Sequence, residues 1–160
     1  MSRFLKLRAG HGLAALLVTV ALGAAGWHEH DQARQRDAAV RQSLAAATAA
    51  AQAIFSYDYR SFDTSVANAR TFVTGKFADE YAQTTAALKP NAVSEQAVVR
   101  AAVSASGVVS AGSDRVELLL YLNQYRRNTN VTGEKVDQNR VVLTMVDVDG
   151  TWKVSDAVAV

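Results

Sequence analysis

The spacing of apolar residues changes once along the chain, near Val98, and this change constrains the fold more than any other feature. Before it, apolar residues recur at three- and four-residue steps, which is typical of amphipathic helices. After it, apolar and polar residues alternate in four runs, which predicts four strands, at about residues 99–106, 116–123, 141–146 and 152–158. Helices followed by consecutive strands with short turns predict an α+β domain with an antiparallel sheet.

The helical part divides into three segments. Residues 31–55 contain no Gly or Pro and are rich in Ala, Arg and Gln, so they predict one long helix. A short second helix is expected over residues 62–69 and a third over residues 76–88, which Pro90 should end or kink. The predicted domain is thus a cone-like arrangement of about three helices packed on a curved four-stranded antiparallel sheet.

The long helix carries a face of small apolar side chains. Two interpretations of this face remain open. In one, it packs on the sheet; in the other, its part nearest the membrane docks a partner helix. The residues of this candidate partner-binding face are Val40, Leu44, Ala47 and Ala51.

Residues 9–27 form a short, largely apolar segment that follows Arg3, Lys6 and Arg8. The length is close to the lower limit for crossing a bilayer as a helix. Cations on its N-terminal side predict a cytoplasmic N-terminus and an extracytoplasmic C-terminal part. The chain is therefore expected to be a single-pass protein of the cell membrane, with a basic tip at 1–8, a transmembrane helix at 9–27 and an extracytoplasmic domain at 28–160.

The same N-terminal segment also has the charged start, apolar run and small residues of a cleaved signal peptide. Absence of a turn signal after Trp27 favours a retained anchor that runs into the next helix. Both interpretations export the domain.

Composition excludes several kinds of chemistry. The chain has no cysteine, which removes disulfides, thiolate metal sites and cysteine nucleophiles. From His28 onward, 14 Lys and Arg stand against 15 Asp and Glu, so the domain lacks the positive charge that nucleic-acid binding needs. His28 and His30 do not share a helix face, and no metal site or cofactor is expected.

Asp58 is the best candidate for a chemical site, because two tyrosines flank it at the predicted end of the long helix. A carboxylate and a hydroxyl in one apolar pocket are the elements of an isomerase-like site. The alternative is structural, with the tyrosines packing and Asp58 and Arg60 capping or pairing at a helix end. No catalytic residue is predicted, and the candidate ligand-binding residues are Tyr57, Asp58, Tyr59 and Tyr121.

Several short motifs follow one another along the chain. They are the N-terminal anchor, Tyr57-Asp58-Tyr59-Arg60, Thr74-Gly75-Lys76-Phe77 with Tyr81, Ser113-Asp114-Arg115-Val116, Asn139-Arg140-Val141-Val142-Leu143-Thr144-Met145 and Gly150-Thr151-Trp152-Lys153-Val154-Ser155-Asp156. In this order the motifs resemble the Mce-associated membrane proteins, whose domain is similar to nuclear transport factor 2. Those proteins are accessories of actinobacterial Mce lipid-import systems.

The resemblance implies a protein that is not an enzyme and that binds and stabilises an Mce-type lipid or sterol import complex in the cell envelope. Components of that transporter and the membrane are then the expected partners. Two alternatives remain. The cone could hold an apolar ligand such as a lipid or sterol, or Asp58 could serve an isomerase-like enzyme.

Overall fold

The computed structural model describes residues 31–160 of the chain. Two compact units are present, residues 1–37 and residues 38–160, and the described part of the first, residues 31–37, is helical and exposed. The predicted basic tip and transmembrane helix lie outside the described residues. Between residues 31 and 160, no helix is long and apolar enough to cross a membrane.

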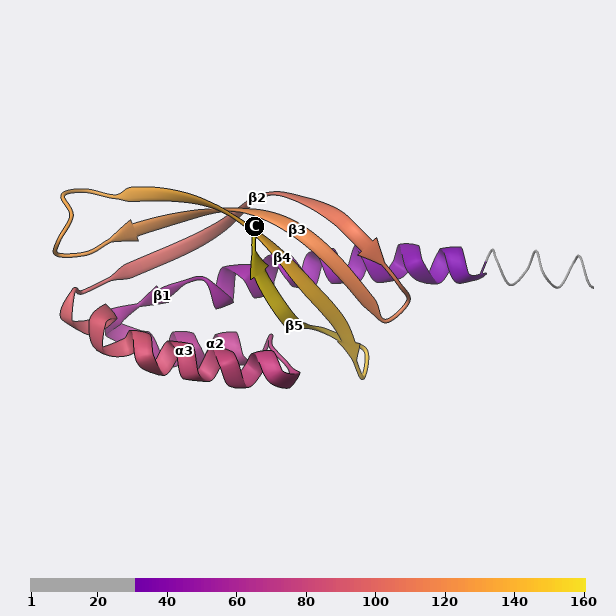
Figure 1. The fold of residues 1–160 in the computed structure, drawn as a ribbon, viewed down its shortest axis with the longest axis horizontal. Helices are drawn as coiled ribbons and strands as arrows, with labels where there is room; N and C mark the ends of the chain where they lie inside the picture. The colour runs from indigo at the N-terminus through magenta and orange to yellow at the C-terminus, as the bar shows by residue number, and fades with distance from the viewer. Residues whose placement is uncertain (1–30) are drawn as a thin grey trace, which may run out of the picture. The chain divides into compact units, whose positions relative to one another are not determined.

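The second unit is an α+β domain in which helices precede a meandering antiparallel sheet (Figure 1). A first helix covers residues 38–54. The sheet has the order β1-β2-β3-β4-β5, so every strand pairs with its neighbours in sequence. The remaining elements are β1 (Tyr57–Asp58), the 3-10 helix η1 (Tyr59–Ser61), α2 (Phe62–Arg70), α3 (Gly75–Ser94), β2 (Val98–Ala111), β3 (Arg115–Arg127), β4 (Lys135–Val148) and β5 (Thr151–Ala159).

The α+β class and the three helices are confirmed, but the sheet has five strands instead of four. The additional strand, β1, has two residues and is held by pairing Tyr57 with Val99 and Asp58 with Val98. A run of two residues is too short to show an alternating pattern, which is why the sequence did not predict it.

Pro90 does not end the third helix, because α3 continues to Ser94 with Pro90 inside it. Proline removes one backbone donor, and its ring crowds the carbonyl four residues earlier. Here both Pro90 and Ala86 are exposed, so water can bond the carbonyl that loses its helical partner.

The core lies between the inner face of the sheet and the first helix. The inner face is built by alternate residues of β3 and β4, such as Leu118, Leu120 and Leu143, none of which has exposed surface. Ala47, Ala50 and Ala51 supply the facing side of the helix. Their small side chains let the helix backbone lie close to the sheet.

Two strand segments in the long hairpins lie outside this core, and we call them the arms of the sheet. The second half of β2, from Ser104 to Ala111, is exposed on both faces, and so is the start of β4, from Lys135 to Arg140. Figure 1 shows the two arms at opposite ends of the sheet. The strands are therefore longer than their buried alternating parts, from which the sequence prediction was made.

Candidate functional site

The segment that leaves the first helix is tied to the sheet by side chains from both sides. The Ser56 hydroxyl accepts a hydrogen bond from the Ala101 backbone N–H at 2.8 Å. The Gln124 side-chain amide donates to the Phe55 carbonyl at 3.3 Å. These bonds, together with the β1–β2 pairing, fix where Tyr57 and Asp58 lie.

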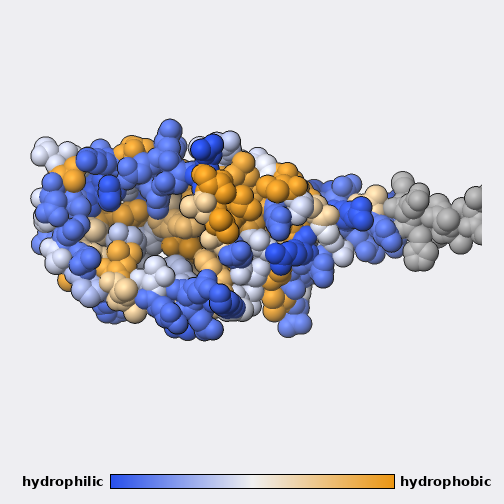
Figure 2. Space-filling model, in the orientation of Figure 1, coloured by the Kyte–Doolittle hydropathy of each residue, from blue (hydrophilic) through white to orange (hydrophobic). Residues whose placement is uncertain are grey.

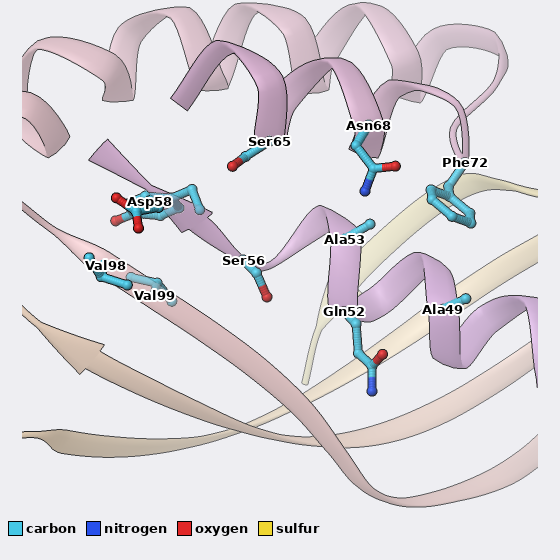
Figure 3. Close-up of a pocket in the computed structure, with 11 residues that line it drawn as sticks. Ala49, Gln52, Ala53, Ser56, Asp58, Ser65, Asn68, Phe72, Val98 and Val99 are labelled. Atoms are coloured by element: carbon cyan, nitrogen blue, oxygen red, sulfur yellow. The ribbon is translucent and has the colours of Figure 1, made fainter. Parts of the chain in front are cut away.

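A cleft of about 460 Å³ opens beside this segment, between the first helix, α2 and the start of β2 (Figure 3). Ser65 and Asn68 point from α2 toward the side on which Ala53 and Ser56 lie. The floor and walls combine apolar groups with neutral hydrogen-bonding groups. The lining residues are Ala49, Gln52, Ala53, Ser56, Tyr57, Asp58, Ser65, Asn68, Phe72, Val98 and Val99.

Asp58 is the one acidic residue of this lining, and its carboxylate is paired with Arg60. The Arg60 Nε donates to the carboxylate at 3.0 Å, and the Arg60 backbone N–H donates to it at 2.9 Å, which caps η1. The side-chain hydrogen bonds from Arg60, then its backbone bond, hold the pKa of the Asp58 carboxyl below its ordinary value. An ionised, capped carboxylate of this kind is a weak proton acceptor.

Replacing Arg60 with Gln is expected to raise the pKa of Asp58 toward its ordinary value, because the charged donor is lost. In the wild type the folded pKa lies below the unfolded one. The pair therefore stabilises the fold at neutral pH and loses this effect as the pH falls through the folded pKa. NMR titration of the Asp58 carboxyl carbon measures the change, with Arg70→Gln as the control. An unchanged Asp58 titration would contradict the assigned cause.

Tyr57 contributes a packed ring to the cleft. Its ring meets Phe62 edge-on, with centroids 5.4 Å apart. Burial is the main cause that raises the pKa of the Tyr57 hydroxyl, opposed by the charge of Arg126 and reinforced by Glu95. The hydroxyl thus stays neutral at physiological pH and is able to donate a hydrogen bond.

The two other candidate ligand-binding tyrosines are not among the lining residues. Tyr59 starts η1, and the Arg60 guanidinium lies over its ring at 5.8 Å. Tyr121 stands on β3 opposite Arg140 and is 43% exposed. Of the four candidates, the structure brings only Tyr57 and Asp58 together in the cleft.

The candidate partner-binding face of the first helix is largely internal. Ala47 and Ala51 have 0% exposure and belong to the core, so neither can contact a partner while the domain is folded. Val40 and Leu44 are partly buried and pack against the same core. The interpretation in which the face packs on the sheet describes the two alanines, because their spacing places them toward β3 and β4.

Several lining residues were missed by the sequence analysis. Gln52, Ser65, Asn68 and Phe72 lie on or beside helices that come together only in the folded domain. Each occupies a position that reads as ordinary helix surface or loop in the sequence. No local signal distinguishes them.

The arrangement suits binding better than bond-making. The cleft has amide, hydroxyl and apolar groups, and its one carboxylate is neutralised by Arg60. No group of three or more His, Cys, Asp or Glu residues that could hold a metal ion is found within the described part of the chain. Neutral amide and hydroxyl groups beside apolar side chains are able to bind an uncharged, partly apolar group.

Comparison with known proteins finds curated relatives, one of similar length and one that is longer. No protein-family model matches the chain. The outer membrane protein Rv1973 of Mycobacterium tuberculosis is 32% identical over 147 residues, which cover 88% of this chain and 88% of that protein. A second protein of that species, Rv1362c, is 29% identical over 150 residues, covering 88% of this chain and 66% of the relative.

Solved structures share the fold at low sequence identity. An IcmL-like type IV secretion system protein from Legionella pneumophila has a TM-score of 0.62 and 14% identity, over 76% of this chain and 91% of that one. The VirB8 protein of Agrobacterium tumefaciens has a TM-score of 0.59 and 12% identity, over 79% and 92%. At such identities the likeness concerns the fold alone, and it is consistent with the predicted fold similar to nuclear transport factor 2.

Proposed function

The chain belongs to the same family as the outer membrane protein Rv1973 of Mycobacterium tuberculosis, and from this kinship we propose that it is a non-catalytic binding subunit of the cell envelope. Its task is to bind and stabilise an Mce-type lipid or sterol import complex, as the motif resemblance implies. An exported domain, held at the membrane by residues 9–27, meets such a complex where it is assembled.

The observation that carries this proposal is the chemistry of the cleft. Its other polar groups are neutral amides and hydroxyls. The single carboxylate, that of Asp58, accepts hydrogen bonds from Arg60. Binding groups that carry no net charge recognise shape and backbone-like hydrogen bonds, which is what a peptide segment of a partner subunit presents. The same groups offer no activated nucleophile and no paired acid and base.

Names of the related proteins support an envelope role. The relative is named an outer membrane protein, and the neighbours in fold include proteins of type IV secretion systems. These names and the proposed export of the domain both support an envelope location. Anchoring in the cell membrane by a single span is a more specific part of the proposal than the envelope location.

Two alternatives receive less support. An apolar ligand inside the cone would need room at the inner sheet positions, yet Leu118, Leu120 and Leu143 are fully buried against the alanines of the first helix. An isomerase-like reaction would need Asp58 as a base, yet its pKa is lowered by Arg60. Catalysis at this site requires the opposite shift, toward the working pH.

Affinity purification of the full-length chain from its native membrane tests the proposal. Mce-type transporter components are expected to copurify with the wild-type chain. Asn68→Arg, which places a charge in the cleft, should lower their recovery about tenfold, equivalent to about 1.4 kcal/mol of binding. Ala67→Arg is the matched control, because Ala67 is the exposed neighbour on the same helix and is not among the lining residues.

The role of the N-terminal segment is tested in the same system. Deleting residues 1–30 should leave a domain that folds. The deletion should nevertheless abolish the contribution of this chain to lipid or sterol import. Full restoration of transport by this freely secreted domain would contradict the anchored-subunit proposal. Equal recovery of transporter components with Asn68→Arg and with wild type would show that the cleft does not take part in partner binding.

A further inference from the structure

The outer face of the sheet, which points away from the first helix, carries an apolar patch. Leu119 on β3, Val142 on β4 and Val158 on β5 are paired across the sheet and form its central row. Tyr121 and Val160 extend it on the next row. Val158 is 50% exposed and Tyr121 43%, and Figure 2 shows hydrophobic surface where Figure 1 marks the C-terminus. We call these five residues the outer patch, and a contiguous exposed apolar surface of this kind is typical of an interaction site.

Charges of opposite sign flank the outer patch at its two ends. Arg140 lies two residues before Val142 on β4. At the other end, Glu117 and Asp156 are the neighbours of Thr144, which lies two residues after Val142. Arg140 and Asp156 form no ion pair within residues 31–160. They cannot pair with each other in one chain, because Arg140 and Thr144 are about 13 Å apart along the strand. A cation and a carboxylate are thus available to a second molecule.

These charges fit a second copy of the same patch. A two-fold axis that crosses the strands at Val142 reverses the strand direction in the second copy. Arg140 of one copy then lies over Thr144 of the other. There it is between Glu117 and Asp156, and the same contact occurs twice. An axis along β3 or β4 would instead place Glu117 against Glu117 or Arg140 against Arg140, which is repulsive. Charge therefore selects the crossing axis.

The crossing axis brings no like charges together elsewhere on the outer face. Residues at equal distances on opposite sides of the central row lie over each other. Glu117, which is 3.7 Å from Arg115 in its own chain, meets Tyr121, whose hydroxyl can donate to the carboxylate. Arg115 meets Asn123, which is uncharged. Sheets packed face to face lie about 10 Å apart, a gap that the side chains of Arg140 and a facing carboxylate can bridge. The outer face is thus complementary to itself.

We propose that two copies of this chain associate through their outer patches, with the two sheets face to face and the two-fold axis crossing the strands at Val142. Such a contact is isologous, because both copies use the same surface. The apolar residues supply the buried centre, and the flanking charges fix the relative direction of the strands. The contact uses a surface separate from the residues that line the cleft, so it does not depend on the proposed function.

Cysteine crosslinking in the native membrane tests this contact with the full-length chain, which has no cysteine of its own. The two copies of Val158 face each other across the axis, so Val158→Cys treated with a short bismaleimide should give a product of twice the chain mass. Val136→Cys is the matched control, because Val136 is 51% exposed and lies six residues before Val142. Its two copies are about 40 Å apart, so its dimer should form at least about tenfold more slowly. Equal rates, no dimer with Val158→Cys, or a product with the mass of a different polypeptide would overturn the proposal.

Charge exchange in the Val158→Cys background tests the direction of the axis. Arg140→Glu should lower the dimer yield several-fold, because the new carboxylate lies between Glu117 and Asp156 of the other copy. Adding Asp156→Arg should restore most of the yield. Lys135→Glu, the same change of charge at an exposed residue of β4 outside the patch, should leave the yield unchanged. Equal losses with Arg140→Glu and Lys135→Glu, or no recovery in the double variant, would overturn the proposed axis.

Discussion

Replacing Ala47 with Asp is expected to lower the free energy of unfolding by about 4 kcal/mol or more, enough to unfold a typical domain of this size at least in part. Ala47 has no exposed surface and lies in the core cluster with the leucines of β3 and β4. A carboxylate placed there loses its water and finds no cation among the core residues. Urea denaturation followed by circular dichroism measures the loss.

Ala45→Asp is the matched control for this experiment. Ala45 lies two residues earlier on the same helix and is exposed. Both variants carry the same change in helix propensity, so Ala45→Asp should cost only about 0.5 kcal/mol. Comparable losses in the two variants would mean that the helix does not bury this face against the sheet.

The pH dependence separates charge from size in the same pair of variants. Burial disfavours the ionised form of an Asp at position 47 and raises its pKa in the folded state. The destabilisation by Ala47→Asp should therefore be smaller at acid pH and grow as the pH rises through that pKa. A penalty that does not change with pH would point to the added volume as the cause.

The elements that bury one face were predictable from the sequence, because burial of one face requires apolar residues at a regular spacing along the chain. Val116, Leu118, Leu120 and Leu122 alternate with less buried residues and form the inner side of β3. Ala47 and Ala51 recur at the helical step and are buried together. In each case the same physical cause, removal of apolar surface from water, produces the pattern and the packing.

The elements that bury neither face were not predictable in this way. The arms of β2 and β4 continue as strands because backbone pairing propagates along the hairpin, and the side chains there carry no alternating pattern. β1 exists because Ser56 and the start of β2 hold the chain after the helix ends. Both depend on contacts with another strand, which a local sequence pattern does not contain.

The cleft was predictable only at its centre. The cluster of two tyrosines, an acid and an arginine drew attention to Tyr57 and Asp58, which do line it. The structural alternative for Asp58, pairing and capping by Arg60, is the arrangement observed. Gln52 and Asn68 become neighbours of this segment only when α2 folds back beside the first helix, so their place required the tertiary structure.

Leu120→Ala is expected to reduce the free energy of unfolding by about 3 kcal/mol, within the range for large-to-small changes in a packed core. Leu120 has 0% exposure and lies on β3 opposite Val141 of β4. Its removal leaves a cavity between the sheet and the first helix, whose small alanines cannot move in to fill it. The urea midpoint, read with an unchanged slope, gives the loss.

Leu119→Ala provides the control and tests the register of the sheet. Leu119 is the adjacent residue on the opposite face, partly exposed and paired with Val142. The same deletion there should cost only about 1 kcal/mol, because less apolar surface returns to water and no closed cavity forms. A shift of one residue in strand register exchanges the two faces of β3, so it would reverse the order of the two losses. A greater loss for Leu119→Ala than for Leu120→Ala would therefore contradict the assigned pairing of β3 with β4, and with it the packed interior that leaves little room for an apolar ligand.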